Sequence, residues 1–576
     1  RKRREPLSLM IPILHQHALR HVHARFERLY GQAAAVRCHA RFSQMLGRYG
    51  VGYPEIAAPR RWDERDAILI TYGDSIHNTE ERPLATLGRF IERHVGDAVS
   101  TVHILPFYLY SSDDGFSVVH YRTLQPGLGG WADVQALGAH HRLMFDLVLN
   151  HASRESSWFN DFELGIAPAS DYFIVQDPAA DLSAVVRPRT HPLLTPVHTR
   201  SGQRHVWTTF SDDQADLNYA NPDVLFEMLD LLLYYIAMGA RVIRLDAIAY
   251  LWKKPGTPCI HLPETHEVVK LMRDLLEIVA PDVLLITETN VPHIENVSYF
   301  GNGDEAHMVY QFSLPPLVLH AMVTGNAAHL SKWASGLAAP PKDCTFLNFT
   351  ASHDGIGVRP LEGVVPAPEI SRIVDHVKQR GGRVSMKTNS DGTESPYELN
   401  ITWFDAMGGL ESTDLHLQRF LCSQTIPLAL RGIPAVYIHS LTATPNDLAG
   451  MEKTGRARSI NRRRWVEAEL QAALGDKNST TARALAELTR LLKLRAQQPA
   501  FHPDAAQKVV ALDDRLFAVE RASLDGKQTM LAVSNVSGVA VEFSAQSAAT
   551  DLIQNRKVSA GKSVRLDPYQ TVWLSR

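Results

Sequence analysis

The sequence predicts a (β/α)8 barrel, and three observations support this prediction. From about residue 66 onward, short runs of aliphatic residues alternate with longer segments of helical periodicity. There are eight such runs, and continuous apolar runs are typical of parallel strands that are buried on both faces. Polar side chains gather where the runs end, which is where the active sites of such barrels form.

The predicted elements alternate in a regular order along the chain. The predicted strands are 67–72, 101–107, 142–149, 241–245, 283–287, 308–314, 345–350 and 435–439. The predicted helices are 84–95, 131–140, 224–238, 264–279, part of 316–338, and 415–428. Parallel neighbours need long crossover connections, and the helical segments supply them.

Two connections are too long for a simple strand–helix unit. Residues 152–223 follow the third predicted strand, and residues 358–410 follow the seventh. Connections of this length usually carry a function or a structure of their own. Because connections that follow a barrel strand lie on the catalytic face, we expect both insertions to shape a substrate site. The second is rich in Gly, Ser and Asn, so it is also compatible with a plain surface loop.

The two ends of the chain differ from the barrel. Residues 1–65 predict a helical extension with helices at 18–30 and 33–48. Residues 505–576 predict a small antiparallel β domain, because short strand-like runs follow one another there without helical segments. The catalytic barrel with its insertions is therefore expected to span residues 66–504.

Composition excludes several classes of protein. Of the 576 residues, 45% are hydrophobic and 21% are charged, as in an ordinary globular protein. The net charge of −3 lacks the basic excess of a nucleic-acid-binding protein. No apolar run approaches the ~20 residues of a membrane span, and the basic start of the chain does not predict a signal peptide.

Cysteine usage favours a reducing, cytoplasmic location. None of the cysteines has the spacing of a zinc site, and they do not form the pattern of a disulfide framework. They are Cys38, Cys259, Cys344 and Cys422.

Reactive side chains follow five of the predicted strands. They are Asp113, His151, Arg244, Asp246, Glu288, His353 and Asp354. Any one of them is equally explained as a helix cap, an ion-pair partner or a buried histidine. Their convergence on one rim of a barrel favours a catalytic site instead.

Two carboxylates that flank one bond suit glycosyl transfer. One attacks the anomeric carbon, the other protonates the leaving oxygen, and a third can hold sugar hydroxyls. Alternation along the strand puts Arg244 and Asp246 on the same face. We therefore expect Arg244 to keep Asp246 ionised, because a nearby positive charge lowers the pKa of a carboxyl group.

The strand-end motifs resemble the four signature regions of the α-amylase superfamily, glycoside hydrolase family thirteen. The motifs are 146–151, 244–246, Glu288 and 353–354, and the resemblance extends over roughly residues 66–470. It implies a retaining double displacement. By position it implies that Asp246 is the nucleophile, Glu288 the acid/base and Asp354 the stabiliser of the transition state. His151, Arg244 and His353 match residues that bind the sugar or support the site.

Further motifs are similar to those of sucrose phosphorylases and their relatives. They lie at 113–116, 130–133, 353–358 and 456–462. This resemblance implies that a pocket for a single glucosyl unit is lined by Asp113, Phe116, Tyr250 and Arg458. It further implies that phosphate replaces water in the second step and that α-glucose 1-phosphate is the product.

The second insertion and the N-terminal extension look more like those of glucosylglycerate phosphorylases. The expected substrate is therefore 2-O-α-glucosylglycerate, with sucrose, a phosphorylated sucrose and glucosylglycerol as alternatives. Arg383 and Lys387 are candidates for binding an anionic acceptor or phosphate, and Arg204 and His205 are weaker candidates. Two cations on a solvated loop need no ligand, so this assignment depends on where the loop lies.

No metal and no organic cofactor are expected. Asn150 sits where some amylases place a calcium ligand, but the phosphorylase-like branch generally lacks this ion, and no cluster of oxygen ligands requires it. No nucleotide-binding loop is present. The expected partners are a small glucoside and inorganic phosphate, and the chain is expected to be a monomer or a homodimer.

Two other functions remain open from the sequence. A hydrolase or transglucosidase would share the strand-end motifs and would differ by its independence of phosphate. A catalytically inactive sugar-binding protein is disfavoured because Asp246, Glu288 and Asp354 are all present.

Overall fold

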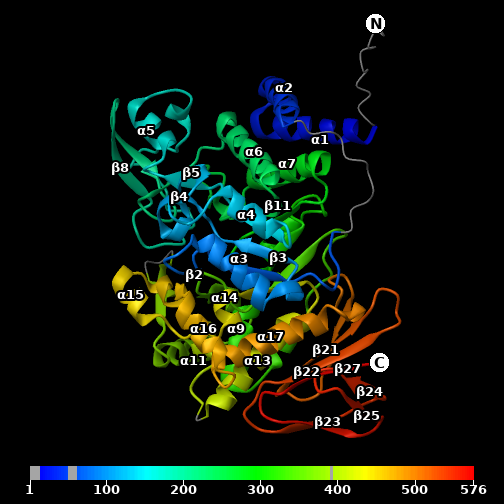
Figure 1. Ribbon diagram of the computed structural model, residues 1–576. Helices are drawn as coiled ribbons and strands as arrows, with labels where there is room; N and C mark the ends of the chain where they lie inside the picture. The colour runs from blue at the N-terminus through cyan, green and yellow to red at the C-terminus, as the bar shows by residue number, and fades with distance from the viewer. Residues whose placement is uncertain (1–12, 50–60, 390–392, 411) are drawn as a thin grey trace.

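The computed structural model describes residues 13–49, 61–389, 393–410 and 412–576. At its centre lies a closed barrel of eight parallel strands, which confirms the predicted fold class (Figure 1). The barrel strands are β1 (Ile68–Thr71), β3 (Thr101–Ile104), β6 (Arg142–Val148), β11 (Ala240–Asp246), β12 (Leu284–Thr287), β13 (Met308–Tyr310), β14 (Thr345–Asn348) and β18 (Ile433–Tyr437).

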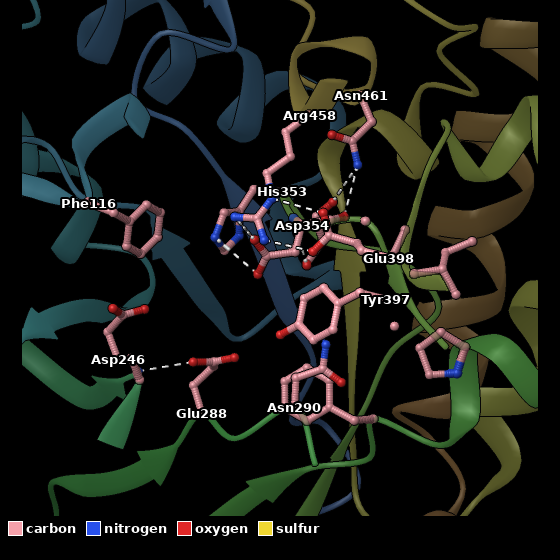
Figure 2. A pocket seen from close by; sticks show the side chains of 18 of the residues that line it. Phe116, Asp246, Glu288, Asn290, His353, Asp354, Tyr397, Glu398, Arg458 and Asn461 are labelled. Carbon is pink, nitrogen blue, oxygen red and sulfur yellow. Dashed lines mark hydrogen bonds and ion pairs between the residues drawn. The ribbon is translucent and has the colours of Figure 1, made fainter. Parts of the chain in front are cut away.

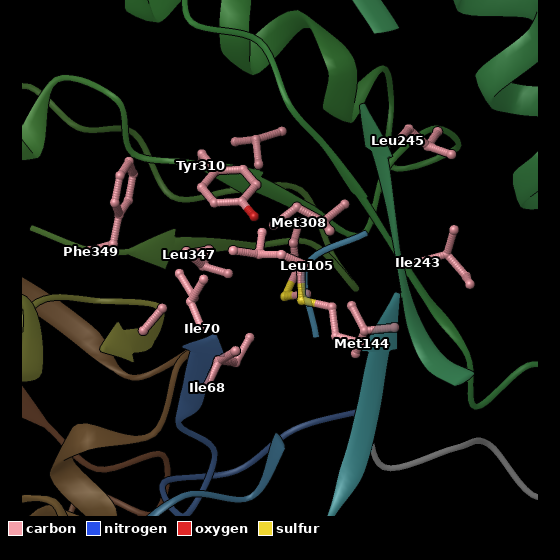
Figure 3. Close-up of a cluster of buried hydrophobic side chains, with 14 of the residues drawn as sticks. Ile68, Ile70, Leu105, Met144, Ile243, Leu245, Met308, Tyr310, Leu347 and Phe349 are labelled. Atoms are coloured by element: carbon pink, nitrogen blue, oxygen red, sulfur yellow. The ribbon is translucent and has the colours of Figure 1, made fainter. Parts of the chain in front are cut away.

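The barrel strands are buried on both faces. Side chains from several strands meet in its interior, among them Ile68, Ile70, Met144, Met308 and Leu347 (Figure 3). Strands of this kind show no polar–apolar alternation, because neither face meets water. This explains why continuous aliphatic runs located them in the sequence.

Helices pack around the barrel, and most of them connect its strands. They are α3 (Pro83–His94), α4 (Trp131–Gly138), α6 (Pro222–Ala237), α7 (Pro263–Val279), α9 (Leu314–Thr324), α10 (Ala328–Ser335), α13 (Thr413–Ala429) and α17 (Thr480–Arg495). The start of α6 illustrates the local signals: the side chain of Asn221 accepts a hydrogen bond from the backbone N–H of Asp223, and Pro222 occupies the first turn.

Both long insertions carry their own secondary structure. The first contains α5 (Ser157–Leu164), the hairpin β8 (Leu194–Thr199) and β9 (Gly202–Trp207), and β10 (Gln214–Asp216), which pairs with β7 (His151–Ser153). The second contains α11 (Ala367–Gln379), α12 (Trp403–Ala406) and the strands β16 (Arg383–Thr388) and β17 (Glu394–Asn400), which form a sheet with β15 (Ile356–Gly357) just before the insertion. The described part of the second insertion is therefore not a plain surface loop.

Short elements follow three other barrel strands, β1, β3 and β18. The hairpin β4 (Tyr108–Ser112) and β5 (Ser117–Leu124) follows β3. After β18 come α14 (Ile438–Leu441), α15 (Leu448–Thr454), β19 (Trp465–Val466), which pairs with β2 (Ile76–His77), and α16 (Glu467–Gly475).

The N-terminal extension forms two helices, α1 (Ile13–Tyr30) and α2 (Gln32–Arg48), at the outer side of the helical layer (Figure 1). α1 packs against α7 and α2 against α6. The Phe26 ring stacks on Phe226 at 5.6 Å, and Arg25 forms ion pairs with Asp274 at 3.1 Å and Glu267 at 3.4 Å. The start of the chain, for which no signal peptide is predicted, lies outside the described residues.

The C-terminal segment forms the predicted antiparallel β domain. One sheet has the order β20 (Ala506–Val509), β21 (Leu516–Ala522), β22 (Thr529–Asn535), β27 (Thr571–Ser575), β24 (Ala549–Asp551) and β25 (Arg556–Val558). A second pair is β23 (Val541–Ser544) with β26 (Ser563–Leu566). Neither β24 nor β25 is predicted from the sequence, because three residues are too few to show a period.

None of the helices in the described part of the chain is both long enough and apolar enough to cross a membrane. The four cysteines are free and buried. Buried thiols of this kind behave as small apolar side chains.

Candidate active site

A pocket lies at the carboxyl ends of the barrel strands, between the two insertions (Figure 2). Most of the predicted site residues line it together. These are Asp113, Phe116, His151, Arg244, Asp246, Glu288, His353, Asp354 and Arg458. Residues far apart in the sequence meet here because parallel strands all end on the same side of the barrel.

The guanidinium of Arg244 joins the two central carboxylates. Its Nη1 lies 2.7 Å from Oδ1 of Asp246 and also contacts Asp146, while its Nη2 lies 3.8 Å from Oε2 of Glu288. Arg244 is almost fully buried. One cation thus holds the last residue of β11 and the first residue after β12 near each other.

Burial raises the pKa of both central carboxyl groups. The pKa of Asp246 rises to about 6 and that of Glu288 to about 7, although the Arg244 guanidinium opposes both shifts. Arg244 lowers the pKa of Asp246 as expected, but the net shift is upward. Desolvation outweighs the ion pair because the carboxyl group lies deep in the pocket.

Asp354 has the opposite shift. Burial opposes its ionisation, but the guanidinium groups of Arg458, Arg462 and Arg244 lower the pKa of Asp354 below its usual value. Arg458 Nη1 lies 2.8 Å from Asp354 Oδ1. The pocket thus contains two carboxyl groups of raised pKa, Asp246 and Glu288, and one of lowered pKa, Asp354.

The second insertion contributes a carboxylate that holds Arg458. Glu398 on β17 accepts hydrogen bonds of 2.9 and 2.7 Å from Nε and Nη2 of Arg458 (Figure 2). Asn461 donates to the backbone carbonyl of Asp354 at 3.0 Å. The segment that follows β18 is in this way tied to the end of β14.

A strained turn places Asp113 at the pocket. Asp113 and Asp114 both have left-handed backbone conformations, with φ of 54° and 48°. Gly115 follows with φ of 108°, and a Cβ there would lie 2.4 Å from the carbonyl oxygen of Pro106, so only glycine fits. Phe116 then stacks on His353, with ring centroids 4.9 Å apart.

His151 is neutral and oriented by its neighbours. Its Nε2 lies 2.9 Å from the carbonyl oxygen of Phe116, and its Nδ1 lies 3.2 Å from Nδ2 of Asn150. Burial lowers the pKa of His151. A neutral imidazole that donates from Nε2 satisfies both contacts.

Asn150, the residue at a calcium-ligand position of some amylases, contacts a lysine. Its Oδ1 accepts a hydrogen bond of 2.7 Å from Nζ of Lys253, and the same Nζ lies 2.5 Å from Oδ2 of the buried Asp216. Asp216 also accepts from the backbone and the hydroxyl of Thr209. The lysine ammonium is thus the positively charged partner of Asn150 Oδ1 and Asp216 Oδ2.

Some predicted residues do not line the pocket. Tyr250 lies one layer behind it, with its ring edge-on to Phe210 at 5.4 Å. Arg383 donates to the backbone carbonyls of Gly381 and Gly382, and Lys387 pairs with Glu362 at 3.1 Å. Neither Arg383 nor Lys387 is among the residues that line the pocket, so their assignment to an anionic acceptor or phosphate stays a prediction. Arg204 and His205 lie on the β8–β9 hairpin and likewise are not lining residues.

Several lining residues are not among the predicted ones. They are Arg189, Phe210, Gln214, Asn290, Tyr397, Glu398 and Asn461. Arg189 is the notable one: its guanidinium lies over the rings of Phe210 at 5.8 Å and Tyr397 at 5.5 Å. No ion pair to a carboxylate is formed by Arg189 within the described ranges. A lone arginine in an irregular segment has no sequence signal of its own.

Comparisons with known proteins show which family this chain resembles. Residues 97–347 match the α-amylase catalytic domain. A glucosylglycerate phosphorylase of Allomeiothermus silvanus is 48% identical over 88% of this chain and 90% of its own length. One of Escherichia coli is 45% identical over 89% and 92%. The crystal structure of a sucrose 6F-phosphate phosphorylase from Thermoanaerobacter thermosaccharolyticum has the same fold, with a TM-score of 0.71, 24% identity, and coverage of 87% of this chain and 98% of that one.

Proposed function

The chain belongs to the α-amylase superfamily, in the branch of the glucosylglycerate and sucrose phosphorylases, and on this premise we propose that it is a glucosylglycerate phosphorylase. The reaction converts 2-O-α-glucosylglycerate and phosphate into α-glucose 1-phosphate and glycerate. The observation that carries the chemistry is the shared contact of Asp246 and Glu288 with the buried guanidinium of Arg244.

In the first step, an oxygen of Asp246 attacks the anomeric carbon while Glu288 protonates the leaving glycerate oxygen. The C1–O bond to glycerate breaks, and an ester bond from C1 to Asp246 forms. A raised pKa suits Glu288 to give up a proton near neutrality. The common guanidinium favours a short separation of the two carboxyl groups, as retaining enzymes require (about 5–5.5 Å).

In the second step, a phosphate oxygen attacks C1 and displaces Asp246. Glu288, now ionised, takes the proton of the attacking oxygen. Two inversions at C1 return the α configuration, so the product is α-glucose 1-phosphate. The double displacement ends with both carboxyl groups in their starting states.

The glucosyl unit is held by the polar groups behind the reacting carboxylates. Asp354 and Asp113 accept hydrogen bonds from sugar hydroxyls, and Arg458 donates to them. The ionised Asp354 also stabilises the positive charge that develops at C1. His151 forms part of the same wall of the pocket, and the stacked pair of Phe116 and His353 covers the sugar ring.

Arg189 is the group that we assign to the anionic acceptor and to phosphate. It lines the pocket, pairs with no carboxylate in the described structure, and contacts the rings of Phe210 and Tyr397. A guanidinium binds a carboxylate or a phosphate through two parallel hydrogen bonds. Glycerate and phosphate occupy the same side of C1 in successive steps, so one cation serves both.

The proposal needs no cofactor besides phosphate as co-substrate, and it includes a cytoplasmic location. Four free, buried cysteines are compatible with a reducing compartment. A sugar phosphate is charged, so a cell retains it when it is formed inside.

The test is release of α-glucose 1-phosphate from glucosylglycerate and from sucrose, each with and without inorganic phosphate. Phosphate-dependent release from glucosylglycerate alone is the expected result. Release from sucrose alone would keep the mechanism and overturn the acceptor. Free glucose at the same rate without phosphate would make the protein a hydrolase.

A further inference from the structure

Two histidines and a glutamate meet on the outside of the barrel, away from the pocket. His320 on α9, His329 on α10 and Glu369 on α11 each present one ligand atom, and these atoms lie within 4.8 Å of one another. Nε2 of His320 lies 2.6 Å and Nε2 of His329 lies 3.7 Å from the same oxygen, Oε2 of Glu369. None of the three lines the substrate pocket.

The fold brings these side chains together from three helices. α9 ends at Gly325, whose left-handed conformation turns the chain directly into α10, and the two imidazole rings meet edge to face at 5.2 Å. α11 belongs to the second insertion and packs against α9 (Figure 1). The cluster therefore spans the junction between the barrel wall and the insertion.

We propose that His320, His329 and Glu369 form a binding site for a divalent transition-metal ion, with Zn²⁺ as the favoured ion. Two imidazoles and one carboxylate are a common zinc ligand set, with water in the fourth position. Ca²⁺ and Mg²⁺ prefer oxygen ligands throughout, so two imidazole nitrogens select against them.

The geometry needs only side-chain adjustment to hold the ion. Zinc bonds of about 2.0–2.1 Å in a tetrahedral arrangement place the ligand atoms ~3.3 Å apart. The contact between His320 and Glu369 must widen from 2.6 Å, and that between His329 and Glu369 must shorten from 3.7 Å. His329 and Glu369 have side-chain exposures of 27% and 39%, which leaves them room to rotate and gives the ion a path from solvent. Arg372 lies near His320 and opposes a cation, but it is exposed and therefore screened.

Metal binding here couples the second insertion to the barrel. α11 leads into β16 and β17, and β17 carries Tyr397 and Glu398 to the pocket. An ion that ties α11 to α9 and α10 stabilises this arrangement, because a ligand that binds only the folded state raises its stability.

The test is equilibrium dialysis of the chelator-treated full chain against Zn²⁺, with His329→Ala and Glu369→Gln as the deciding variants. Both residues are partly exposed, so these variants are expected to fold, whereas His320 is buried. Controls are Asp375→Asn, an exposed acid on the same helix, and His198→Ala, an exposed histidine on β8. The chain has 26 histidines, so the total zinc bound does not report on this site alone. The site is measured by the difference in bound zinc between the wild type and the ligand variants.

The wild type and both controls are expected to bind one more Zn²⁺ per chain than the two ligand variants, whose affinity falls at least about tenfold. Zn²⁺ is also expected to raise the Tm of the wild type and not of His329→Ala, and Co²⁺ should give a visible tetrahedral spectrum only where the site is intact. Equal zinc binding and equal Tm shifts in the wild type and both ligand variants would overturn the site. Phosphorolysis without added metal is a separate measurement, so this result does not depend on the proposed function.

Discussion

Glu398 holds Arg458 through two hydrogen bonds of 2.9 and 2.7 Å inside the pocket, and the same guanidinium lies 2.8 Å from Asp354. Glu398 comes from the second insertion, Arg458 from the segment after β18 and Asp354 from the end of β14. The side chain of Glu398 is 3% exposed, so this pair is screened little by solvent. The second insertion therefore forms part of the pocket wall.

We expect Glu398→Gln to lower kcat/KM for phosphorolysis by about 10²-fold, the scale of effect that a small misplacement of a catalytic group produces. Without the charge of Glu398, the Arg458 guanidinium is held less firmly in its place beside Asp354, and we expect the sugar to bind less well. Glu394→Gln, an exposed change on the same strand, should leave the rate unchanged. Steady-state kinetics with both variants, after thermal unfolding has shown that they fold, decides the matter; equal rates would exclude a positioning role for Glu398.

Asp246→Asn should remove the covalent intermediate. The amide is a poor nucleophile, so kcat is expected to fall by more than about 10³-fold. Intact-protein mass spectrometry after incubation with an α-glucosyl fluoride should detect a glucosyl adduct on the wild type and none on the variant. Asp212→Asn, an exposed change in the first insertion, is the matched control. Normal turnover of Asp246→Asn would overturn its assignment as the nucleophile.

The pH dependence of kcat/KM should be bell-shaped. Asp246 acts in its ionised form, so activity is expected to fall as the pH drops below about 6. Glu288 acts first in its protonated form, so activity is expected to fall as the pH rises above about 7. The two groups interact, so the limbs belong to the pair. In Glu288→Gln the alkaline limb should disappear. A donor with a good leaving group should restore much of the rate of the first step. An unchanged alkaline limb would show that a group other than Glu288 causes it.

Substitutions of Arg189 and Arg383 distinguish between the two candidate anion-binding residues. Arg189→Ala should raise the KM for phosphate, and that for glycerate in the reverse reaction, by at least about tenfold, because a charge-assisted pair contributes about 1.5–3 kcal/mol. Arg383→Ala should leave both within about twofold, since its guanidinium binds backbone carbonyls. Arg189→Lys, which keeps the charge without the planar fork, should recover part of the loss. A larger rise in these KM values for Arg383→Ala than for Arg189→Ala would assign the anion site to Arg383.

Lys253→Met should destabilise the fold. The lysine ammonium is buried against Asp216 and Asn150, and removing one partner of a buried pair costs about 3–5 kcal/mol because the other charge stays behind. Urea unfolding of the variant measures this loss. The double variant Lys253→Met with Asp216→Asn leaves no unpaired charge and is expected to recover part of it; equal loss in both would show that packing and not charge is responsible.

The barrel and the central residues of the site follow from the sequence for a physical reason. Strands that are buried on both faces must be apolar at every position, so the segments around Ile68, Met144 and Leu347 stand out as continuous runs. Asp246 and Glu288 follow such runs directly, and all strand ends of a parallel barrel share one rim. The proximity of Asp246 and Glu288 could therefore be predicted without the tertiary structure.

Only the tertiary structure decided which residues of the two insertions line the pocket. Arg189 and Glu398 lie in insertions whose position over the barrel no local period encodes, while Arg383, equally plausible by charge, turns its guanidinium to backbone carbonyls. The sign of the pKa shift of Asp246 was likewise undecidable from its neighbour Arg244, because desolvation depends on everything packed around the group. Local chemistry and periodicity determine which residues stand at strand ends, whereas long-range packing determines which charges are buried together and what they face.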